Sequence, residues 1–400
     1  MLNLLIREIL RKQLMSKLPN FVFQTVADIR FGVDCLESLP GIIEQRFAAT
    51  RVLLITDKGL CQAGVLDELI VLLQSSKLNV TVFDDVQSDP PESVILAAAE
   101  RAAQVDVVIG VGGGSSMDTA KLAAAVCMGQ QPLHTMYGVD QITSSRKPLV
   151  LIPTTAGTGS EVTPISVVTT GTSTKSGVVS SVLYADIALL DPRLLLGLPA
   201  HITAETGVDA MVHAIEAFTS KIRKNPLSDQ LALRALGLLT KHLPLSYQQG
   251  QNLEHRGGTL LGAMLAGQAF ANAPVAGVHA LAYPLGGIYH ISHGLSNALM
   301  LTHVLRFNLD SAIIAYSELA DVLIPEQQNL SAERKAASFI RYIEAFCQDL
   351  GLNQRLRDFA ITQNDLPALA KAAMGQTRLL QNNPKTITFD DALSIYQQAW

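Results

Sequence analysis

Cysteine is scarce in this chain of 400 residues. The four cysteines are far apart in the sequence and include no CxxC pair; they are Cys35, Cys61, Cys127 and Cys347. A disulfide framework and a zinc ribbon both need closely spaced cysteines, so the sequence excludes both classes. Unpaired cysteines are typical of a reducing compartment, and we expect a cytoplasmic location.

Charge is also scarce, and what there is does not favour basic residues. Charged residues make up 16% of the chain and the formal net charge is −5. A nucleic-acid partner is therefore not expected, because such partners select a basic face. The nearest approach to a membrane span is the segment 257–276, which is broken by Gln268, Asn272 and Pro274. We expect no membrane partner either, since a span needs about twenty apolar residues.

Apolar sequence is abundant, at 48% of the residues, and the length suggests about two domains. Apolar runs of strand length alternate with helical patterns in the first half of the chain. The predicted strands are 21–31, 51–56, 79–83, 106–110 and 148–152, and the predicted helices between them are 59–75, 91–104 and 115–128. Continuous apolar strands between helices indicate a parallel sheet that is covered on both faces. The segment 165–190 suggests more strand and turn, and no strand is predicted after Pro199.

These patterns predict a two-domain α/β plus all-α protein. We expect an N-terminal extension helix over 1–19, which would be a surface helix or a subunit contact. A Rossmann-like dinucleotide-binding domain follows over 20–199, and an all-helical metal and substrate domain over 200–400. The cleft between the two domains is the natural place for a site.

Two turns that follow predicted strands are suited to binding an anion. The first contains Gly112, Gly113 and Gly114, followed by Ser115, whose spacing to Asp118 fits a capping box. The second runs over 153–161 and is rich in threonine and glycine. Two such turns at the ends of parallel strands suit a dinucleotide, although a plain glycine-rich turn is the alternative. Asp57 follows another strand and would accept hydrogen bonds from a ribose, unless it only caps a helix.

The stretch from Gly257 to Leu305 contains no charged residue but carries four histidines, His279, His290, His293 and His303. Buried imidazoles need hydrogen bonds or a metal ion. Upstream, Asp209 and His213 are four residues apart in a helical pattern and share one face. Together with His279 and His293 they would form an Asp-His₃ set suited to Fe²⁺ or Zn²⁺, leaving His290 and His303 as spares. Such a pair taken alone is often an ordinary surface or core contact.

Four motifs occur in order: GGGSSMDTAK, PTTAGTGSEVT, GVDAMVHAIEAF and HALAYPLGGIYHISHGLSNA. With them, and with its ending NNPKTITFDDALSIYQQAW, the chain resembles the iron-containing (group III) NAD-dependent alcohol dehydrogenases over nearly its whole length. The resemblance implies a dehydroquinate synthase-like architecture and a metal held by Asp209, His213, His279 and His293. It also implies NAD contacts at Asp57, Gly113, Gly114, Ser115, Asp118, Thr154, Thr155, Thr158, Thr163, Val167 and Lys175.

The chain departs from the family pattern at two positions. Many members carry a histidine four residues after the third metal ligand, where this chain has Tyr283. That histidine is thought to help move the alcohol proton, so Tyr283 is the catalytic candidate, with a packing role as the alternative. Its ordinary pKa of about 10 makes it a poor base at neutral pH. Asp89 stands where the family more often has asparagine.

The sequence as a whole predicts metal-dependent, NAD(H)-linked interconversion of an alcohol and an aldehyde or ketone. The metal would polarise the alcohol oxygen while hydride passes to the nicotinamide. An oxo-acid reductase or hydroxyacid–oxoacid transhydrogenase would keep every motif. A lyase of the dehydroquinate-synthase type and a non-enzymatic nucleotide-binding protein are further alternatives. From the resemblance we expect a small-molecule substrate, iron or zinc as the metal, and a homodimer or larger homo-oligomer.

Overall fold

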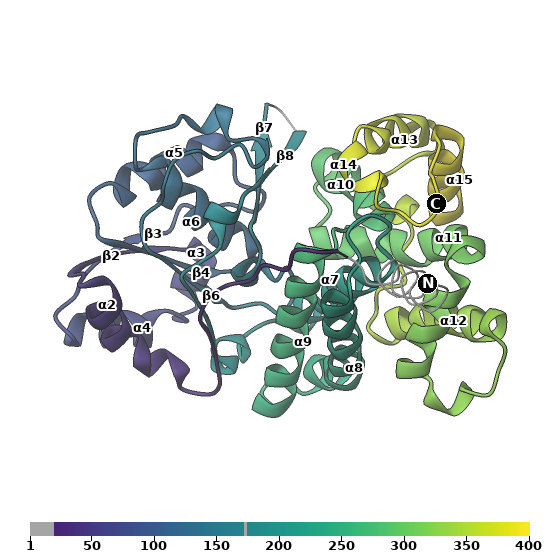
Figure 1. Cartoon of the computed structure of the whole chain (residues 1–400), viewed down its shortest axis with the longest axis horizontal. Helices are drawn as coiled ribbons and strands as arrows, with labels where there is room; N and C mark the ends of the chain where they lie inside the picture. The colour runs from purple at the N-terminus through teal and green to yellow at the C-terminus, as the bar shows by residue number, and fades with distance from the viewer. Residues whose placement is uncertain (1–19, 172–173) are drawn as a thin grey trace, which may run out of the picture.

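The computed structural model describes residues 20–171 and 174–400, which form two halves lying side by side (Figure 1). The N-terminal half is built on a six-stranded parallel sheet with the strand order β1-β9-β6-β4-β2-β3. Its strands are β1 (Ile29–Phe31), β2 (Arg51–Ile55), β3 (Asn79–Phe83), β4 (Val107–Gly112), β6 (Leu149–Pro153) and β9 (Ile187–Leu190). From Ala200 onwards the described residues form helices and no strand. This is the predicted combination of an α/β half and an all-helical half.

Alternate residues of the strands point to opposite faces of the sheet. Leu53 and Ile55 pack in one core with α5 and α6, whereas Val52 and Leu54 pack in another with α2 and α4. Helices therefore cover both faces, which is why the inner strands β2, β4 and β6, and β9 beside them, are almost entirely apolar and buried. The helices of this half are α2 (Leu39–Phe47), α3 (Lys58–Gln62), α4 (Asp67–Ser75), α5 (Glu92–Ala102) and α6 (Gly114–Val126).

A smaller sheet with the order β5-β8-β7 lies beside α5 and α6 (Figure 1). Its strands are β5 (Gly138–Val139), β7 (Ile165–Thr170) and β8 (Thr174–Val179), and β7 and β8 are antiparallel. Short 3-10 helices connect the larger elements: η1 (Cys35–Ser38), η2 (Leu133–Thr135), η3 (Ser160–Val162), η4 (Ser181–Leu183), η5 (Pro192–Leu195), η6 (Pro325–Gln327), η7 (Leu356–Phe359) and η8 (Gln363–Asp365).

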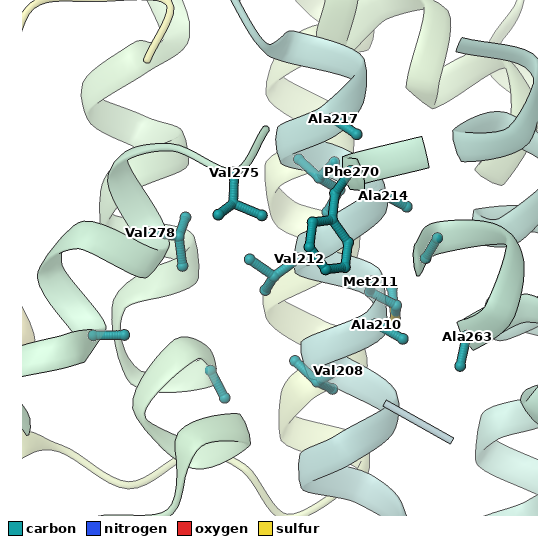
Figure 2. Packing of buried hydrophobic residues seen from close by; sticks show 14 of the residues in the cluster. Val208, Ala210, Met211, Val212, Ala214, Ala217, Ala263, Phe270, Val275 and Val278 are labelled. Atoms are coloured by element: carbon teal, nitrogen blue, oxygen red, sulfur yellow. The ribbon is translucent and has the colours of Figure 1, made fainter. Parts of the chain in front are cut away.

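The helical half is organised around α7 (Ala200–Thr219), which is buried along most of its length. Phe270 lies over α7, and Val212 points toward Val275 and Val278 (Figure 2). The other helices are α8 (Pro226–Gln248), α9 (Leu253–Asn272), α10 (Gly277–Tyr289), α11 (His293–Leu323), α12 (Ala332–Asp349), α13 (Leu366–Met374), α14 (Thr377–Leu380) and α15 (Phe389–Ala399). By length and composition α11 would be able to cross a membrane, but it packs against α7, α10 and α12 as a core helix.

The predicted strand over 21–31 is wrong for most of its length, because only Ile29–Phe31 is a strand. The residues before it lie along the helical half and hydrogen-bond to side chains of α9. The Gln24 N–H donates to Asn272 Oδ1 at 2.8 Å, and Gln268 donates to the Thr25 hydroxyl at 2.8 Å. Tertiary contacts with a helix therefore replace the strand pairing that the residue types favour.

The predicted helix over 59–75 is two helices, α3 and α4. The chain turns between them at Gly64, where φ is +68°, a conformation that glycine adopts without strain. The expected extension helix over 1–19 lies outside the described residues. The last strand ends at Leu190 and α7 begins at Ala200, and the domain boundary near residue 199 stays a prediction.

One backbone contact joins the two halves without any side chain between them. Gly159, in the turn after β6, lies against Gly267 on α9. A Cβ built on Gly267 would lie 2.8 Å from the Gly159 Cα and 2.9 Å from a methyl of Val162. Gly159 itself has a φ of +60°. Neither position therefore has room for a side chain unless the two halves move apart.

We expect Gly267→Ala to lower the free energy of unfolding by about 1–3 kcal/mol, because overpacking against a backbone cannot be relieved by side-chain rotation. The measurement is urea unfolding followed by circular dichroism. Gly237→Ala on α8 is the matched control, since its new Cβ would meet only Val322, at 3.7 Å. That control should be neutral or stabilising by up to about 1 kcal/mol. Equal unfolding midpoints for the two variants would contradict the close contact.

Candidate active site

Four side chains from three helices converge at one point. Asp209 and His213 lie one turn apart on α7, His279 lies in the first turn of α10, and His293 begins α11. One ligand atom of each lies within 4.8 Å of every other. The Asp209 Oδ1 is 3.9 Å from the Nε2 of His213 and 3.8 Å from that of His279. Its distance to the Nε2 of His293 is 3.6 Å. The fold thus brings together the four side chains predicted as ligands.

These separations and atom types fit a single divalent ion. In a tetrahedral site with bonds of about 2.1 Å, ligand atoms lie about 3.4 Å apart, and the spacings to the Asp209 oxygen are slightly wider. A carboxylate oxygen with imidazole nitrogens and no thiolate suits Fe²⁺ or Zn²⁺. Asp209 is 2% exposed, so without a cation its charge would be costly to bury.

The protonation of the cluster favours metal binding. Burial lowers the pKa of His213 to about 3 and that of His293 to about 4, so both imidazoles are neutral and keep a free lone pair. Burial alone would raise the pKa of Asp209, but the neighbouring imidazoles outweigh it, and the net pKa lies below the ordinary value. At neutral pH the Asp209 carboxylate therefore faces the neutral imidazoles of His213 and His293.

Glu216 orients one of these imidazoles from behind. Its carboxylate accepts from His279 Nδ1 at 2.7 Å and from the N–H groups of Ala276 and Val278 at 2.8 and 2.6 Å. A proton held on Nδ1 by this bond leaves Nε2 as the lone-pair donor that faces Asp209. The same contacts fix the start of α10 against α7. Glu216 therefore sets both the tautomer and the position of His279.

Asn297 lies one turn after His293 on α11 and holds the cluster from the other side. Its Nδ2 donates to Asp209 Oδ1 at 2.6 Å and lies 3.3 Å from the Nε2 atoms of His279 and His293. Its own Oδ1 is buried and has no hydrogen-bond partner among the residues that the structure describes. This amide fixes which oxygen of Asp209 faces the imidazoles.

The first glycine turn is built for close approach of a ligand to the backbone. Gly112 ends β4 with a φ of +145°, and a Cβ there would lie 2.7 Å from the Ser116 hydroxyl. A Cβ on Gly114 would lie 2.9 Å from a methyl of Thr158 in the second turn. The two turns therefore touch, and α6 begins between them with its free N–H groups.

The predicted cofactor residues line two adjoining cavities that share Gly114 and Ser115. One, of about 790 Å³, is lined by Asp57, Gly113, Gly114, Ser115, Thr154 and Thr155. The other, of about 150 Å³, is lined by Gly114, Ser115, Asp118, Thr158, Thr163, Val167 and Lys175. Asp57 also caps α3 by accepting from the Leu60 N–H at 3.0 Å, so the helix-cap alternative holds beside the cavity position.

The predicted capping box of Ser115 and Asp118 is wrong. The helix α6 begins at Gly114, two residues earlier than that box requires, and Asp118 bonds instead to the second turn and β7. Its oxygens accept from the Ser160 hydroxyl at 2.6 Å and from the Val167 N–H at 2.8 Å. The buried Lys121 completes this link by donating to the same Ser160 hydroxyl at 2.7 Å. Asp118 therefore ties the two turns together.

The smaller cavity joins the cradle to the metal cluster. Besides the cofactor residues it is lined by His213, His279, His293, Tyr283, Arg378 and Asp89, with Phe270 and Val275 as apolar wall. The Tyr283 ring lies 6.0 Å from the His293 ring, centroid to centroid. Burial raises the Tyr283 pKa, so its hydroxyl stays protonated at neutral pH. Asp89, with a φ of +53°, forms an ion pair with Lys175 at 2.8 Å.

The two spare histidines lie outside the group of four. His290 follows α10 in a left-handed conformation and lines a neighbouring pocket with Asp89 and Lys175. His303 lies two turns or more along α11 from His293. Neither belongs to the ligand group that the described residues form. Their interpretation as spares stays a prediction.

Sequence reasoning missed Glu216 and Asn297, although both carry a local signal. Glu216 is seven residues after Asp209 and three after His213, so helical spacing places all three on one face. Asn297 is four residues after His293, again one helical turn. A search for polar residues at helical spacing from each predicted ligand would have found both.

Comparison with known proteins gives a consistent result. A sequence model described as "Iron-containing alcohol dehydrogenase" matches residues 27–192, and one described as "Fe-containing alcohol dehydrogenase family, C-terminal" matches residues 203–400. The chain is 38% identical over 363 residues to long-chain-alcohol dehydrogenase 1 of Geobacillus thermodenitrificans (strain NG80-2), covering 89% of this chain and 91% of that one. It is 34% identical over 375 residues to 1,3-propanediol dehydrogenase of Klebsiella pneumoniae, covering 92% and 96%. A crystal structure of 1,3-propanediol oxidoreductase superposes with a TM-score of 0.91 at 33% identity, covering 96% and 100%.

We expect Glu216→Gln to weaken metal binding by about 10- to 100-fold, because the amide cannot hold the His279 tautomer as the carboxylate does. The affinity is measured by competition of the purified protein with a chromogenic chelator for Zn²⁺. Glu254→Gln, on the exposed side of α9, is the control and should bind like the unaltered protein. Unchanged affinity in a folded Glu216→Gln protein would mean that Glu216 only anchors α10.

Proposed function

The chain belongs to the iron-containing alcohol dehydrogenase family, and from that premise we propose how it interconverts an alcohol and its aldehyde or ketone with NAD(H). The observation that carries the proposal is a single cavity lined both by the three histidines of the Asp-His₃ cluster and by residues of the two glycine turns. A metal centre and a dinucleotide cradle on one small cavity suit hydride transfer to or from a carbon whose oxygen faces the metal. The enzyme is accordingly an oxidoreductase.

Asp209, His213, His279 and His293 would hold the metal, with iron favoured by the family and zinc compatible with the same donors. When bound, the ion supplies Lewis-acid polarisation of the substrate oxygen and the cofactor accepts or gives the hydride. The role of the protein's own residues is to position the metal, the substrate and the cofactor. Glu216 and Asn297 fix the ligands, and the wall formed by Phe270 and Val275 keeps water away from the reacting carbon.

NAD would lie along the two adjoining cavities. The glycine turns and the first N–H groups of α6 would bind its pyrophosphate, with the nicotinamide toward Thr163, Val167 and the metal cluster. Asp57 would accept from the ribose hydroxyls at the other end and repel a 2′-phosphate, which favours NAD over NADP. Lys175 would lie beside the cofactor with its charge largely offset by Asp89. The other residues predicted to contact NAD line the same two cavities.

Tyr283 is proposed as the group that gives a proton to the substrate oxygen during carbonyl reduction. Its side chain lines the cavity with its ring 6.0 Å from that of His293, and its raised pKa keeps the hydroxyl a donor at neutral pH and not a base. Two of the relatives are named for neutral substrates, a long-chain alcohol and 1,3-propanediol, and another is a sulfoacetaldehyde reductase. An oxo-acid reductase or transhydrogenase would use the same groups.

The family also supports a cytoplasmic homodimer or larger homo-oligomer, which fractionation and sedimentation would test.

The protein purified without metal should form no NADH from butanol or 1,3-propanediol, and anaerobic addition of Fe²⁺ or Zn²⁺ should restore turnover. A chelator should abolish it again, because the cluster then lacks its Lewis acid. The assay follows absorbance at 340 nm, a general property of NADH, and repeats with NADP should be at least about 10-fold slower if the Asp57 charge repels the 2′-phosphate. NAD binding without turnover on any alcohol or carbonyl, whatever the metal, would sink the proposal.

Tyr283→Phe should lower kcat for aldehyde reduction by about 100-fold or more if the hydroxyl supplies the proton, as is typical for loss of a general acid. Steady-state kinetics at several pH values make the measurement. Tyr289→Phe, farther along α10 and outside the cavity lining, is the control. A Tyr283→Phe enzyme with unaltered kcat would assign Tyr283 a packing role.

A further inference from the structure

Arg378 reaches the small cavity from the helical half. It lies on α14 and belongs to the cavity lining together with Tyr283 and three of the metal-site histidines. Its guanidinium extends toward β8 of the N-terminal half, because a Cβ built on Gly177 would lie 3.3 Å from Nη2. Burial raises the pKa of Tyr283, and the Arg378 charge works against that rise, as expected for neighbours. Arg378 therefore faces the place where a substrate would lie.

The Arg378 guanidinium is unusual because nothing in the described part of the chain accepts from it. The side-chain hydrogen bonds that involve Arg378 there are accepted by its backbone carbonyl oxygen and do not involve the guanidinium. The other arginines that are not fully exposed all have acceptors for their guanidinium groups. Arg146, for example, pairs with Asp186 at 2.6 Å, and Arg256 donates to Thr203 and two carbonyls. The remaining ones, with their carboxylate partners, are Arg30 with Asp28 and Arg193 with Asp34. Arg378 is half-buried like them but unpaired.

The acidic groups that line the cavity are already engaged. Asp89 is paired with Lys175 at 2.8 Å. Asp118 accepts from the Ser160 hydroxyl and the Val167 N–H, with Lys121 3.6 Å away. Among the described residues that line the cavity, no acidic side chain is thus left over to neutralise Arg378. The part of the cavity near α14 therefore has no negative charge to balance the Arg378 guanidinium.

The cofactor phosphates are poor candidates for this missing anion. The pyrophosphate cradle lies in the glycine turns and opens into the larger cavity, whose lining includes Gly113 and Thr155 but not Arg378. A guanidinium presents several N–H donors in a plane that matches the oxygens of a carboxylate, sulfonate or phosphate. Apolar walls such as Phe270 and Val275 strengthen such a contact by limiting competition from water.

We propose that Arg378 binds an oxyanion group carried by the substrate, so that the preferred substrate is an aldehyde or ketone with an acidic group, reduced to the corresponding hydroxy acid or its sulfonate or phosphate analogue. This rests on the proposed function and adds the substrate class. The carbonyl would face the metal cluster while the acidic end faces α14. Arg378 is then a specificity-determining residue, and the hydride and proton steps are those already described.

The test compares matched substrates on the metal-loaded, full-length enzyme with NADH. Succinic semialdehyde is set against butanal, and sulfoacetaldehyde against propanal, so that the carboxylate and sulfonate arms are read separately. We expect kcat/KM to be at least about 10-fold higher for the anionic member of one pair, the size of a charge-assisted hydrogen bond. In Arg378→Gln the ratio of anionic to neutral kcat/KM should fall by about 10- to 100-fold, mainly through KM, and Arg378→Lys should restore part of it.

A binding measurement separates recognition from chemistry. Succinamate and butanamide have a carbonyl that does not accept hydride, and their affinity for the NADH complex is read from NADH fluorescence. Arg378→Gln should weaken succinamate more than butanamide, whereas Arg234→Gln, exposed on α8 and outside the cavity lining, should change neither.

Each outcome has a distinct meaning. Good turnover of neutral aldehydes with equal or poorer turnover of anionic ones would overturn the inference and leave the proposed function standing. So would an Arg378→Gln enzyme that loses NADH affinity equally with every substrate, since Arg378 would then serve the cofactor. No turnover of any carbonyl by the metal-loaded enzyme would instead refute the proposed function.

Discussion

The structure depends on burying the Asp209 carboxylate against a stretch of the helical half that contains no charged residue. Asp209 is 2% exposed, and the stretch 257–305 that surrounds it contains no charged residue. A buried carboxylate without a counter-charge costs several kcal/mol or more, so the surroundings have to supply dipoles, donors or a cation. The three imidazoles and the Asn297 amide supply donors and ligands. Their positions fix how α7, α10 and α11 meet.

The two halves contribute different parts of the candidate site. The parallel sheet ends in two glycine turns, which suit a phosphate but carry no metal ligand. The helices carry the predicted metal ligands, and the described residues of the helical half form no comparable glycine cradle. A reaction that needs both groups requires the turns and the cluster to meet on one cavity, and the ties through Asp118, Lys121 and Ser160 keep the turns in register with β7. Stability and function therefore depend on the same interface.

Local sequence patterns predicted part of the fold and of the candidate site, and the resemblance to a known family added to that prediction. Apolar periodicity was enough for the alternating strands and helices and for the all-helical second half, because burial on both faces leaves a clear signal. The ligand set came from a helical pair, Asp209 and His213, and from family resemblance. The strand over 21–31 was wrong because Gln24 and Thr25 bond to α9, a contact between segments that are far apart in sequence. Arg378 was missed for the same reason, since only the fold places α14 at the cavity.

The contact of Gly159 with Gly267 limits how the enzyme can move. Two backbones that touch directly can roll over each other, but pulling them apart would open a void that no side chain fills. A relative movement of the two halves would therefore be a rotation about this point and not a separation. The pivot lies close to the phosphate cradle, so a small angle there becomes a large displacement at the far rim of the cleft. The reacting groups would stay nearly fixed while the mouth opens.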